Sequence, residues 1–534
     1  MRKYSYIVFM ALVVVGFCGL SACKKTSAEP ETPTPPPTTT EPKASGTRAE
    51  LTKDSIFLYA KELYYWNASL PSYETFNPRA FASNEAELYA MTQYSLDPST
   101  GKPYEYVSGS SEPKYSYFDY ADATGKTSAL KADLNGTAND YGFSVDYNSK
   151  TDVVVKYVYP NSPAAAQGLA RGCKITSVNG RTDLTYSSSA INFLNEAIFG
   201  SNASVSLSFT DLNGKAKSAV ITSSTYTVNP IFFTNVYTVG TKKVGYIVFN
   251  AFTNNVSAAL TSTFSNFAAQ GVTELVVDLR YNGGGYVSTA TQLINLAAPA
   301  SQTGSTMFTT YYNTYLQGLN TISERKASVL VNQPLLDASG ALQNFTSGVN
   351  GKYVTYADLD YLPTSADNIE KFAKSGSLAL SRIYFIVTGS TASASELTIN
   401  SLRPVMDVKL IGRTTYGKPV GFFPITIDKV DMYIPEFETK NKNGVGGYYS
   451  GLTVDKEAAE DLTKSWGDES EVLLAYALLY AKTGSFVTTA SKSASLATSK
   501  TIPNRLSAEE MKLTAEKLDQ NGFKNMIMTP TRKF

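Results

Sequence analysis

Residues 274–285 read ELVVDLRYNGGG, a mainly apolar run at 274–279 that is followed three residues later by three glycines. A short, mainly apolar run bounded by a turn signal is typical of a strand that is buried on both faces. Three consecutive glycines let the backbone turn sharply and leave N–H groups open to a ligand. Glycine-rich turns after strands are common, so this segment alone predicts a buried strand followed by a tight loop.

The chain around this strand alternates between strand and helix patterns. The predicted strands are 244–249, 274–279, 382–387 and 409–412, and the predicted helices are 257–269, 394–402 and 471–482. Strand, helix and strand in this order indicate an α/β core. We place this core at 228–484, beginning with a linker near 228–236. The remaining residues, 485–534, are predicted to form a tail with one helix at 507–521.

Two further regions precede the core. Helical periodicity from Leu51, with Asp54 and Ser55 as candidate caps, and a second helical stretch at 85–94 predict a small helical domain at 50–138. Residues 97–120 within it are predicted to be loop. Short β-type runs separated by Asn-Gly turns predict a β domain at 139–227. Its predicted strands are 142–147, 152–159, 174–178 and 203–210. The expected fold class is therefore multidomain α+β.

Composition excludes several classes of function. The 534 residues include 47 basic and 46 acidic side chains, so the net charge of +1 gives no reason to expect a nucleic-acid partner. Histidine is absent from the whole chain. This absence excludes Ser-His-Asp and Cys-His catalysis and any histidine-ligated metal site.

Two loops after predicted strands carry candidate catalytic side chains. The run GSTASASEL at 389–397 ends a strand and begins a helix, so a serine there faces the N–H groups of the new helix. Capping of that helix by Ser, Thr and Glu is the alternative interpretation. The run YGKPVG at 416–421 holds Lys418 after a strand, and the alternative there is an ordinary surface lysine.

The N-terminus has the order of an export signal. Arg2 and Lys3 precede an apolar run at 6–20, which is short for a membrane-spanning helix. LSAC at 20–23 resembles the bacterial lipobox, which implies that residues 1–22 are a lipoprotein signal peptide and that Cys23 carries lipid. Lys24 then favours the outer membrane of the cell envelope, and which face it occupies stays open. A plain secretory signal or a short anchor helix is the alternative.

The residues beyond the signal extend this interpretation. Residues 23–49, rich in Pro and Thr, cannot bury apolar surface and are predicted to form an extended tether. With Cys18 removed and Cys23 lipidated, only Cys173 would remain as a possible free thiol, so no intramolecular disulfide is available.

The β domain resembles a PDZ domain. The resemblance is carried by YGFS at 141–144, SPAAAQGL at 162–169, GCKI at 172–175 and VNG at 178–180. It implies that Tyr141, Gly142 and Phe143 form the loop that binds the carboxylate of an extended peptide. Cys173 stands where the family usually has Asp. The alternative is a PDZ fold that only braces the neighbouring domain.

The three loop segments and the PDZ-like segment together resemble the S41 family of carboxy-terminal processing, or tail-specific, serine peptidases, over roughly 50–482. The resemblance implies a ClpP/crotonase-like α/β peptidase domain with a Ser-Lys dyad and no cofactor. The matching motif positions are Ser393 as nucleophile and Lys418 as base, with Ser390 and Ser395 as weaker alternatives. The backbone N–H groups of Ala394 and Gly285 would form the oxyanion hole. GLTVD at 451–455 resembles a structural strand of the family.

The implied activity is hydrolysis of exported or unfolded polypeptides, with C-terminal segments as one candidate target, through an acyl-enzyme. Lysine acts as a base only when neutral, and burial lowers the pKa of a lysine. One residue departs from the family pattern, because Phe422 stands where many members place a Gln that orients the lysine. This departure leaves open a weakly active or inactive peptide-binding lipoprotein. A polymer-binding surface lipoprotein is a third possibility.

Overall fold

The computed structural model describes residues 45–120, 134, 136–337, 341–487, 505–518 and 526–527. All of them belong to one compact unit, Pro42–Phe534. The predicted signal peptide, most of the predicted tether and the predicted lipidation site at Cys23 lie outside the described residues. Among the described residues, no helix is both long enough and apolar enough to cross a membrane.

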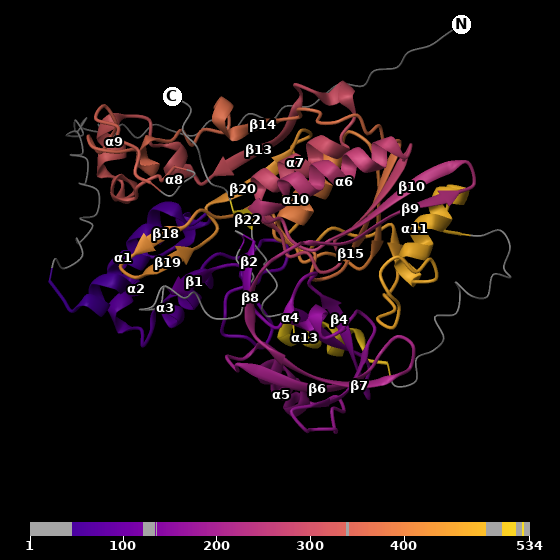
Figure 1. The fold of residues 1–534 in the computed structure, drawn as a ribbon. Helices are drawn as coiled ribbons and strands as arrows, with labels where there is room; N and C mark the ends of the chain where they lie inside the picture. The colour runs from indigo at the N-terminus through magenta and orange to yellow at the C-terminus, as the bar shows by residue number, and fades with distance from the viewer. Residues whose placement is uncertain are drawn as a thin grey trace, which may run out of the picture. The chain divides into compact units, whose positions relative to one another are not determined.

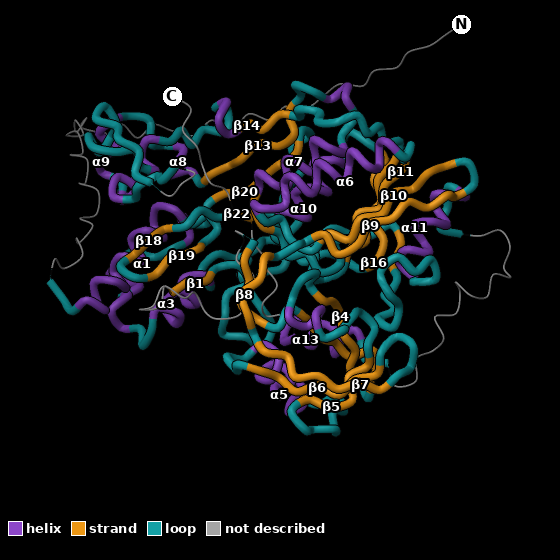
Figure 2. Tube along the Cα trace, in the orientation of Figure 1, coloured by secondary structure: helices purple, strands orange, loops and turns teal. Residues whose placement is uncertain are grey.

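A six-stranded sheet forms the centre of the α/β region (Figures 1 and 2). Its strands are, in spatial order, β21 (Lys456–Glu457), β16 (Asp407–Gly412), β15 (Arg382–Val387), β11 (Glu274–Asp278), β10 (Lys242–Phe249) and β9 (Ile231–Val239). Neighbouring strands from β10 to β21 are parallel, and β9 pairs with β10 in the antiparallel direction. The predicted mixed α/β fold is therefore confirmed.

Helices cover both faces of this sheet. The helices α6 (Ser257–Ala269), α7 (Val287–Ala297) and α10 (Ala394–Leu402) pack on one face, and α11 (Val472–Thr483) packs on the other (Figure 1). Side chains alternate along each strand, so Val277 and Phe385 join the first cluster while Val276 and Tyr384 join the second. Burial on both faces explains the unbroken apolar runs that predicted these strands.

The predicted linker at 228–236 is wrong, because most of it belongs to β9. This strand lies at the edge of the sheet and is only partly buried, so its sequence IFFTNVYTV lacks the apolar run of the inner strands. The predicted strand at 451–455 is also wrong, since the regular pairing begins at Lys456.

Further sheets lie beside the central one. One has the order β14 (Ile369–Lys371), β13 (Thr306–Tyr312), β20 (Phe437–Asn441) and β17 (Val420–Gly421), and the short helices α8 (Thr314–Gln317) and α9 (Ile322–Ala327) follow β13. Another joins β1 (Tyr117–Tyr120), β19 (Val430–Tyr433) and β18 (Ile425–Ile427). The expectation of loop throughout 97–120 is thus wrong at its end. Pairing with a partner more than 300 residues away forms β1, and Tyr117 stacks on Tyr433.

The N-terminal region contains the helices α1 (Arg48–Leu63), α2 (Tyr73–Phe76) and α3 (Asn84–Thr92). The first helix begins before the predicted position because Thr47 caps it in a reciprocal pair with Glu50. Asp54, a predicted cap, instead pairs with Arg79. Ile56 and its buried neighbours on α1 join the same hydrophobic cluster as the central sheet. The helices of this region therefore share their core with the α/β region.

A separate five-stranded antiparallel sheet, which we call the β3–β7 module, has its own core. Its strands are β3 (Phe143–Ser149), β4 (Asp152–Val158), β5 (Lys174–Val178), β6 (Ser204–Thr210) and β7 (Ala216–Thr222), and its helices are α4 (Pro163–Ala166) and α5 (Ser188–Phe199). The four strands predicted here are confirmed. The strand β2 (Thr137–Asp140) precedes the module in sequence, β8 (Ser224–Thr227) follows it, and these two strands pair with each other. Cys173 is buried with a free thiol.

The C-terminal residues that the structure describes include the helix α13 (Ala508–Leu518) and the short strand β22 (Met526–Ile527). The helix α13, within the stretch predicted to be helical, packs against the β3–β7 module (Figure 2). The two-residue strand β22 pairs with β12 (Gly285–Tyr286).

Candidate active site

Three loops meet at one edge of the central sheet. The glycine loop follows β11, the serine loop follows β15 and the lysine loop follows β16, and these three strands are adjacent and parallel. Because parallel strands end at the same edge of a sheet, the topology brings the three loops together. Hydrogen bonds tie the first two directly: Ala392 N and Ser395 Oγ both donate to the carbonyl of Asn282.

The glycine loop requires glycine where it turns. Gly284 and Gly285 have φ values of 109° and 140°, which L side chains rarely adopt. A Cβ on Gly285 would also lie 2.3 Å from the carbonyl oxygen of Phe252. Asn282 holds the loop from within, accepting from Gly284 N at 2.9 Å and donating to the carbonyl of Phe249 at 2.9 Å. The backbone of Gly285 is therefore held rigidly beside the serine loop.

Ser393 occupies a strained turn at the start of α10. Its φ of 64° and ψ of −113° are unusual for a residue with a side chain. The residue is 0% exposed, and its Oγ has no hydrogen-bond partner among the described residues. A buried, unpaired hydroxyl on a strained turn between a strand and a helix matches the geometry of a nucleophilic serine. Ala394, the next residue, supplies the first N–H of the helix.

The alternative serines have different surroundings. Ser395 is also fully buried, but its Oγ donates to the carbonyl of Asn282 at 3.0 Å and so fastens the two loops together. Ser390 lies partly exposed on the turn after β15, where its N–H donates to Thr388 Oγ1. The geometry favours Ser393 over both as a nucleophile.

Lys418 is 1% exposed, in contrast to an ordinary surface lysine. Gly417 before it has a φ of 85°, and a Cβ there would meet the carbonyl of Tyr449 at 2.3 Å. The carbonyl of Gly417 accepts from the hydroxyl of Tyr115. Lys418 Nζ lies 3.8 Å from the centre of the Phe422 ring. The π face of Phe422 therefore contacts the buried side-chain nitrogen, in the geometry of a cation–π pair.

Glu396 connects the serine and lysine loops. Its Oε2 accepts from the backbone N–H of Ser393 at 2.8 Å and from that of Lys418 at 2.8 Å. Its Oε1 accepts from Gly417 N at 2.8 Å and from the Thr415 hydroxyl. Burial raises the pKa of Glu396, and these four hydrogen bonds oppose that shift. One fully buried carboxylate thus fixes the backbones of both candidate catalytic residues.

A second buried acid, Glu436, lies near the lysine. Its N–H donates to the carbonyl of Gly421 and its Oε2 accepts from Phe423 N, so it flanks the segment that carries Phe422. Its Oε1 is buried without a partner among the described residues. Burial raises the pKa of Glu436 well above its usual range, and the charge of Lys418 opposes that shift.

The sequence predicts neither role. Its pattern indicates Glu396 only as a helix cap and does not indicate Glu436. The capping position three residues after Ser393 was an available signal for Glu396. No local signal existed for Glu436, because it approaches Lys418 only through the pairing of β17 with β20.

Comparison with known proteins gives a family match for the region that holds the three loops. Residues 243–444, from β10 to just beyond β20, match the model of Peptidase family S41. We call residues 243–444 the S41 segment, because they are similar to this family. The S41 segment contains all three loops and both buried acids.

Two relatives carry names that describe their activity. A chloroplastic C-terminal processing peptidase of Tetradesmus obliquus is 28% identical over 171 residues, which cover 30% of this chain and 37% of the relative. A carboxyl-terminal-processing protease of Picosynechococcus is 25% identical over 231 residues, which cover 40% of this chain and 53% of the relative. The matches thus span about a third and about half of these relatives' lengths.

The fold extends beyond the S41 segment. A solved structure from Bacteroides fragilis NCTC 9343, assigned to the S41 proteases, is 22% identical with a TM-score of 0.51. The likeness covers 80% of this chain and 97% of that one. Most of the described residues therefore share an architecture with that protein.

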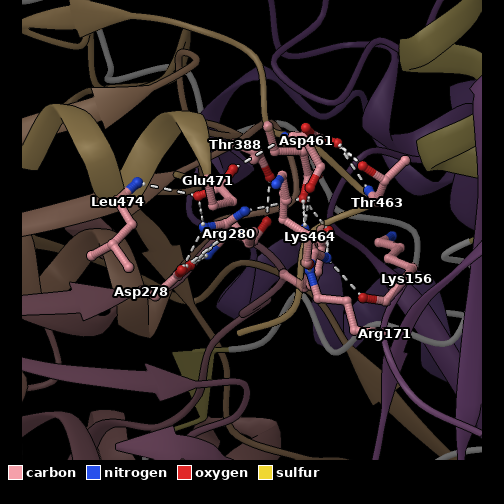
Figure 3. A network of polar contacts seen from close by, with 12 residues as sticks. Lys156, Arg171, Asp278, Arg280, Thr388, Asp461, Thr463, Lys464, Glu471 and Leu474 are labelled. Atoms are coloured by element: carbon pink, nitrogen blue, oxygen red, sulfur yellow. Dashed lines mark hydrogen bonds and ion pairs between the residues drawn. The ribbon is translucent and has the colours of Figure 1, made fainter. Parts of the chain in front are cut away.

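A buried charge network joins the S41 segment to the β3–β7 module (Figure 3). Arg280, next to the glycine loop, bonds to Asp278, Glu471 and Glu460 at 2.7–3.2 Å. Arg171 of the module bonds to the same oxygen of Glu460 at 2.8 Å. Both arginine side chains are at most 2% exposed. Glu460 is therefore the shared counter-ion of two buried cations from different parts of the fold.

The network makes a pH-dependent prediction. Burial raises the pKa of Glu460, but Arg171 and Arg280 outweigh it and hold the pKa at about 2. Glu460→Gln leaves two buried cations without this counter-ion, so we expect the free energy of unfolding at pH 7 to fall by about 3 kcal/mol. The ionised Glu460 stabilises the fold above its unfolded pKa of about 4.5 and loses this effect as pH falls toward 2.

The measurement is chemical unfolding of both proteins between pH 3 and 8. The difference in stability should shrink as pH falls below about 4.5. Glu457→Gln, at an exposed glutamate in the same segment, is the matched control and should change little. A constant difference at all pH values would contradict the assigned role of Glu460.

The predicted peptide-binding loop lies in the β3–β7 module. Tyr141, Gly142 and Phe143 form the turn into β3, and Gly142 has a φ of 78°. The carbonyl of Gly142 accepts hydrogen bonds from Tyr159 N and Ser162 Oγ, so the segment that follows β4 holds this turn in place. Among the described residues, no group of acidic or cysteine side chains could hold a metal ion.

Proposed function

We propose that this chain is a serine peptidase in which Ser393 is the nucleophile and Lys418 is the general base. The observation that carries this proposal is the Glu396 carboxylate, which binds the backbones of a strained, buried serine and a buried lysine at once. If Glu396 served only to cap α10, the backbone N–H of Lys418 would not need to donate to the same oxygen, Oε2, as the backbone N–H of Ser393. The names of the two relatives, a C-terminal processing peptidase and a carboxyl-terminal-processing protease, support the peptidase part of this proposal.

The proposed mechanism follows from these positions. Neutral Lys418 takes the proton of Ser393 Oγ as that oxygen attacks the carbonyl carbon of a peptide bond. The N–H groups of Gly285 and Ala394 stabilise the negative oxygen of the tetrahedral intermediate. Lys418 returns the proton to the leaving amine, and an ester to Ser393 remains. Water then attacks this ester, again with Lys418 as base, and releases the second product.

Phe422 and Glu436 are proposed to position Lys418 in place of the missing amide. The ring of Phe422 supports the nitrogen at 3.8 Å, and the free Oε1 of Glu436 offers an acceptor on the same segment. Burial raises the pKa of Glu436 and the charge of Lys418 opposes that shift, so the two groups titrate as a coupled pair. Ionised Glu436 favours the charged form of Lys418 and stabilises the ammonium that forms during attack.

Glu436→Gln tests this positioning role. We expect the plateau kcat to fall about 10-fold, because the ammonium formed during attack loses a partner that can ionise. The half-maximum of the pH profile of kcat/KM should also move to lower pH, since no carboxylate can then favour charged Lys418. The measurement is a pH profile of both proteins on one peptide substrate.

Glu438→Gln provides the matched control for this profile. Glu438 lies two residues further along and accepts from the hydroxyls of Tyr65 and Tyr449, a role that an amide can also fill. A fall in kcat without any shift in the pH profile would show that Glu436 only supports the fold.

A non-catalytic peptide-binding protein is the second candidate function. The specific observation in its favour is Phe422, whose ring face stabilises charged Lys418 and occupies the place of the orienting amide.

The decisive experiment is incubation of the full chain, purified in detergent, with a chemically unfolded and fluorescently labelled protein. Peptides should accumulate with the wild type and not with Ser393→Ala. Equal fragments from both proteins would overturn the dyad, and binding without fragments would favour the second candidate. A matched pair of substrates with free and amidated C-termini would then report on carboxylate recognition.

The remaining proposals concern the other domains. The β3–β7 module is proposed to be a PDZ-like domain that presents polypeptides through Tyr141, Gly142 and Phe143. Cys23 is proposed to carry lipid and to anchor the protein at the outer membrane of a bacterial cell envelope. Mass spectrometry of the purified N-terminus tests the modification directly.

A further inference from the structure

The helix α13 lies against the β3–β7 module where a peptide ligand would bind. It contacts the edge strand β3 and the helix α5. Leu506, just before the helix, and Leu518, its last residue, are buried in the core of the module. A PDZ-like domain takes its peptide between an edge strand and a helix. The chain's own helix thus lies along the strand and the helix that a peptide ligand of the proposed PDZ-like domain would contact.

The helix also has the direction of a ligand. The carbonyl of Leu518 lies 3.5 Å from Ser144 Oγ, at the start of β3. Glu510, near the N-terminal end of α13, forms an ion pair at 2.8 Å with Lys150, which lies just beyond the C-terminal end of β3. The C-terminal end of α13 therefore points toward the loop of Tyr141, Gly142 and Phe143, as the C-terminus of a bound peptide would.

A second contact places the same segment at the active site. Met526 and Ile527 form β22, which pairs in parallel with Gly285 and Tyr286 of the glycine loop. Ile527 also bridges to Phe422, whose ring supports Lys418. The strand lies between the proposed oxyanion glycine and the lysine segment. An extended substrate would use the same backbone edge, because strand addition supplies its hydrogen bonds.

We propose that residues 505–518 and 526–527 are a built-in ligand that occupies both the module groove and the active-site edge, and so excludes substrate until it is displaced. The inhibitory part of this proposal rests on the proposed peptidase function. Covalent connection gives the segment a high effective concentration at both sites, so a substrate in solution competes poorly. The surface ion pair of Lys150 and Glu510 adds little free energy of binding, so it does not make the occupancy irreversible.

The test uses full-length variants. Leu518→Asp places a charge in the module core and should release α13, raising kcat/KM on an unfolded labelled protein about 10-fold. Leu513→Asp, on the same helix but 38% exposed, is the matched control and should stay within twofold. Ile527→Asp provides a second release variant at the active-site end, where the side chain is only partly buried and the module core is untouched.

A binding measurement separates this inference from the peptidase proposal. In the Ser393→Ala background, a labelled synthetic peptide of residues 505–534 should bind the Leu518→Asp chain at least about 10-fold more tightly than the chain with Leu518 intact. Equal affinity would overturn the inference whether or not the protein cleaves substrates. If no variant hydrolyses protein but the affinities differ, the peptidase proposal fails and the occupancy stands.

Intact mass spectrometry distinguishes a ligand from a substrate. The wild-type chain should keep its C-terminal residues during incubation. Time-dependent loss of residues 526–527 from the wild type, and not from Ser393→Ala, would overturn the inference, because the segment would then be a substrate.

Discussion

Lys418→Ala and Ser393→Ala are each expected to lower kcat for peptide hydrolysis at least about 10⁴-fold, and the double variant should be no slower than either one. The two residues act in one step, because the serine attacks only as the lysine takes its proton. Loss of either therefore removes the same transition-state stabilisation. The measurement is single-turnover hydrolysis of a labelled peptide by the three variants and the wild type.

Two further substitutions sharpen this prediction. Lys418→Arg keeps the charge and much of the volume, but a guanidinium cannot accept a proton, so activity should be lost as fully as with alanine. Ser395→Ala removes the hydrogen bond to Asn282 and should leave most of the activity. If Ser395→Ala is the variant that abolishes hydrolysis, the nucleophile has been assigned to the wrong serine.

Glu396→Gln is expected to lower kcat about 10²- to 10³-fold and to destabilise the fold by about 3 kcal/mol. The carboxylate accepts four hydrogen bonds, two on each oxygen. An amide in its place turns an NH₂ group toward two of these donors. Either the backbone N–H groups of Ser393 and Lys418, or the backbone N–H of Gly417 and the hydroxyl of Thr415, then lose their common acceptor, and the attack distance is no longer held.

The measurements for this variant are kcat, KM and the thermal unfolding midpoint. Thr415→Val is the matched control, because it removes one donor to Glu396 and keeps all three backbone donors. It should lower kcat far less than Glu396→Gln does. An unchanged kcat in folded Glu396→Gln protein would show that the carboxylate serves stability alone.

The sequence by itself determined the local features of the site. Strands buried on both faces have unbroken apolar runs, so β11 and β15 were predictable together with the turns that follow them. The absence of histidine excludes the commonest base, and the runs GSTASASEL at 389–397 and YGKPVG at 416–421 carry the family resemblance that implies Ser393 and Lys418. These signals lie within short stretches of chain, where residue type and spacing carry the information.

Only the tertiary structure decided how those pieces meet. The strands β1 and β9 are partly exposed, because β1 pairs with a strand far away in sequence and β9 lies at the edge of its sheet. Their sequences therefore resemble loop and linker. Glu396 could be recognised as a cap, but its second role depends on where β16 delivers Lys418. Glu436 and β22 reach the site through contacts across much of the chain. Such contacts leave no periodic trace in a sequence, because they depend on the packing of whole elements rather than on the preferences of neighbouring residues.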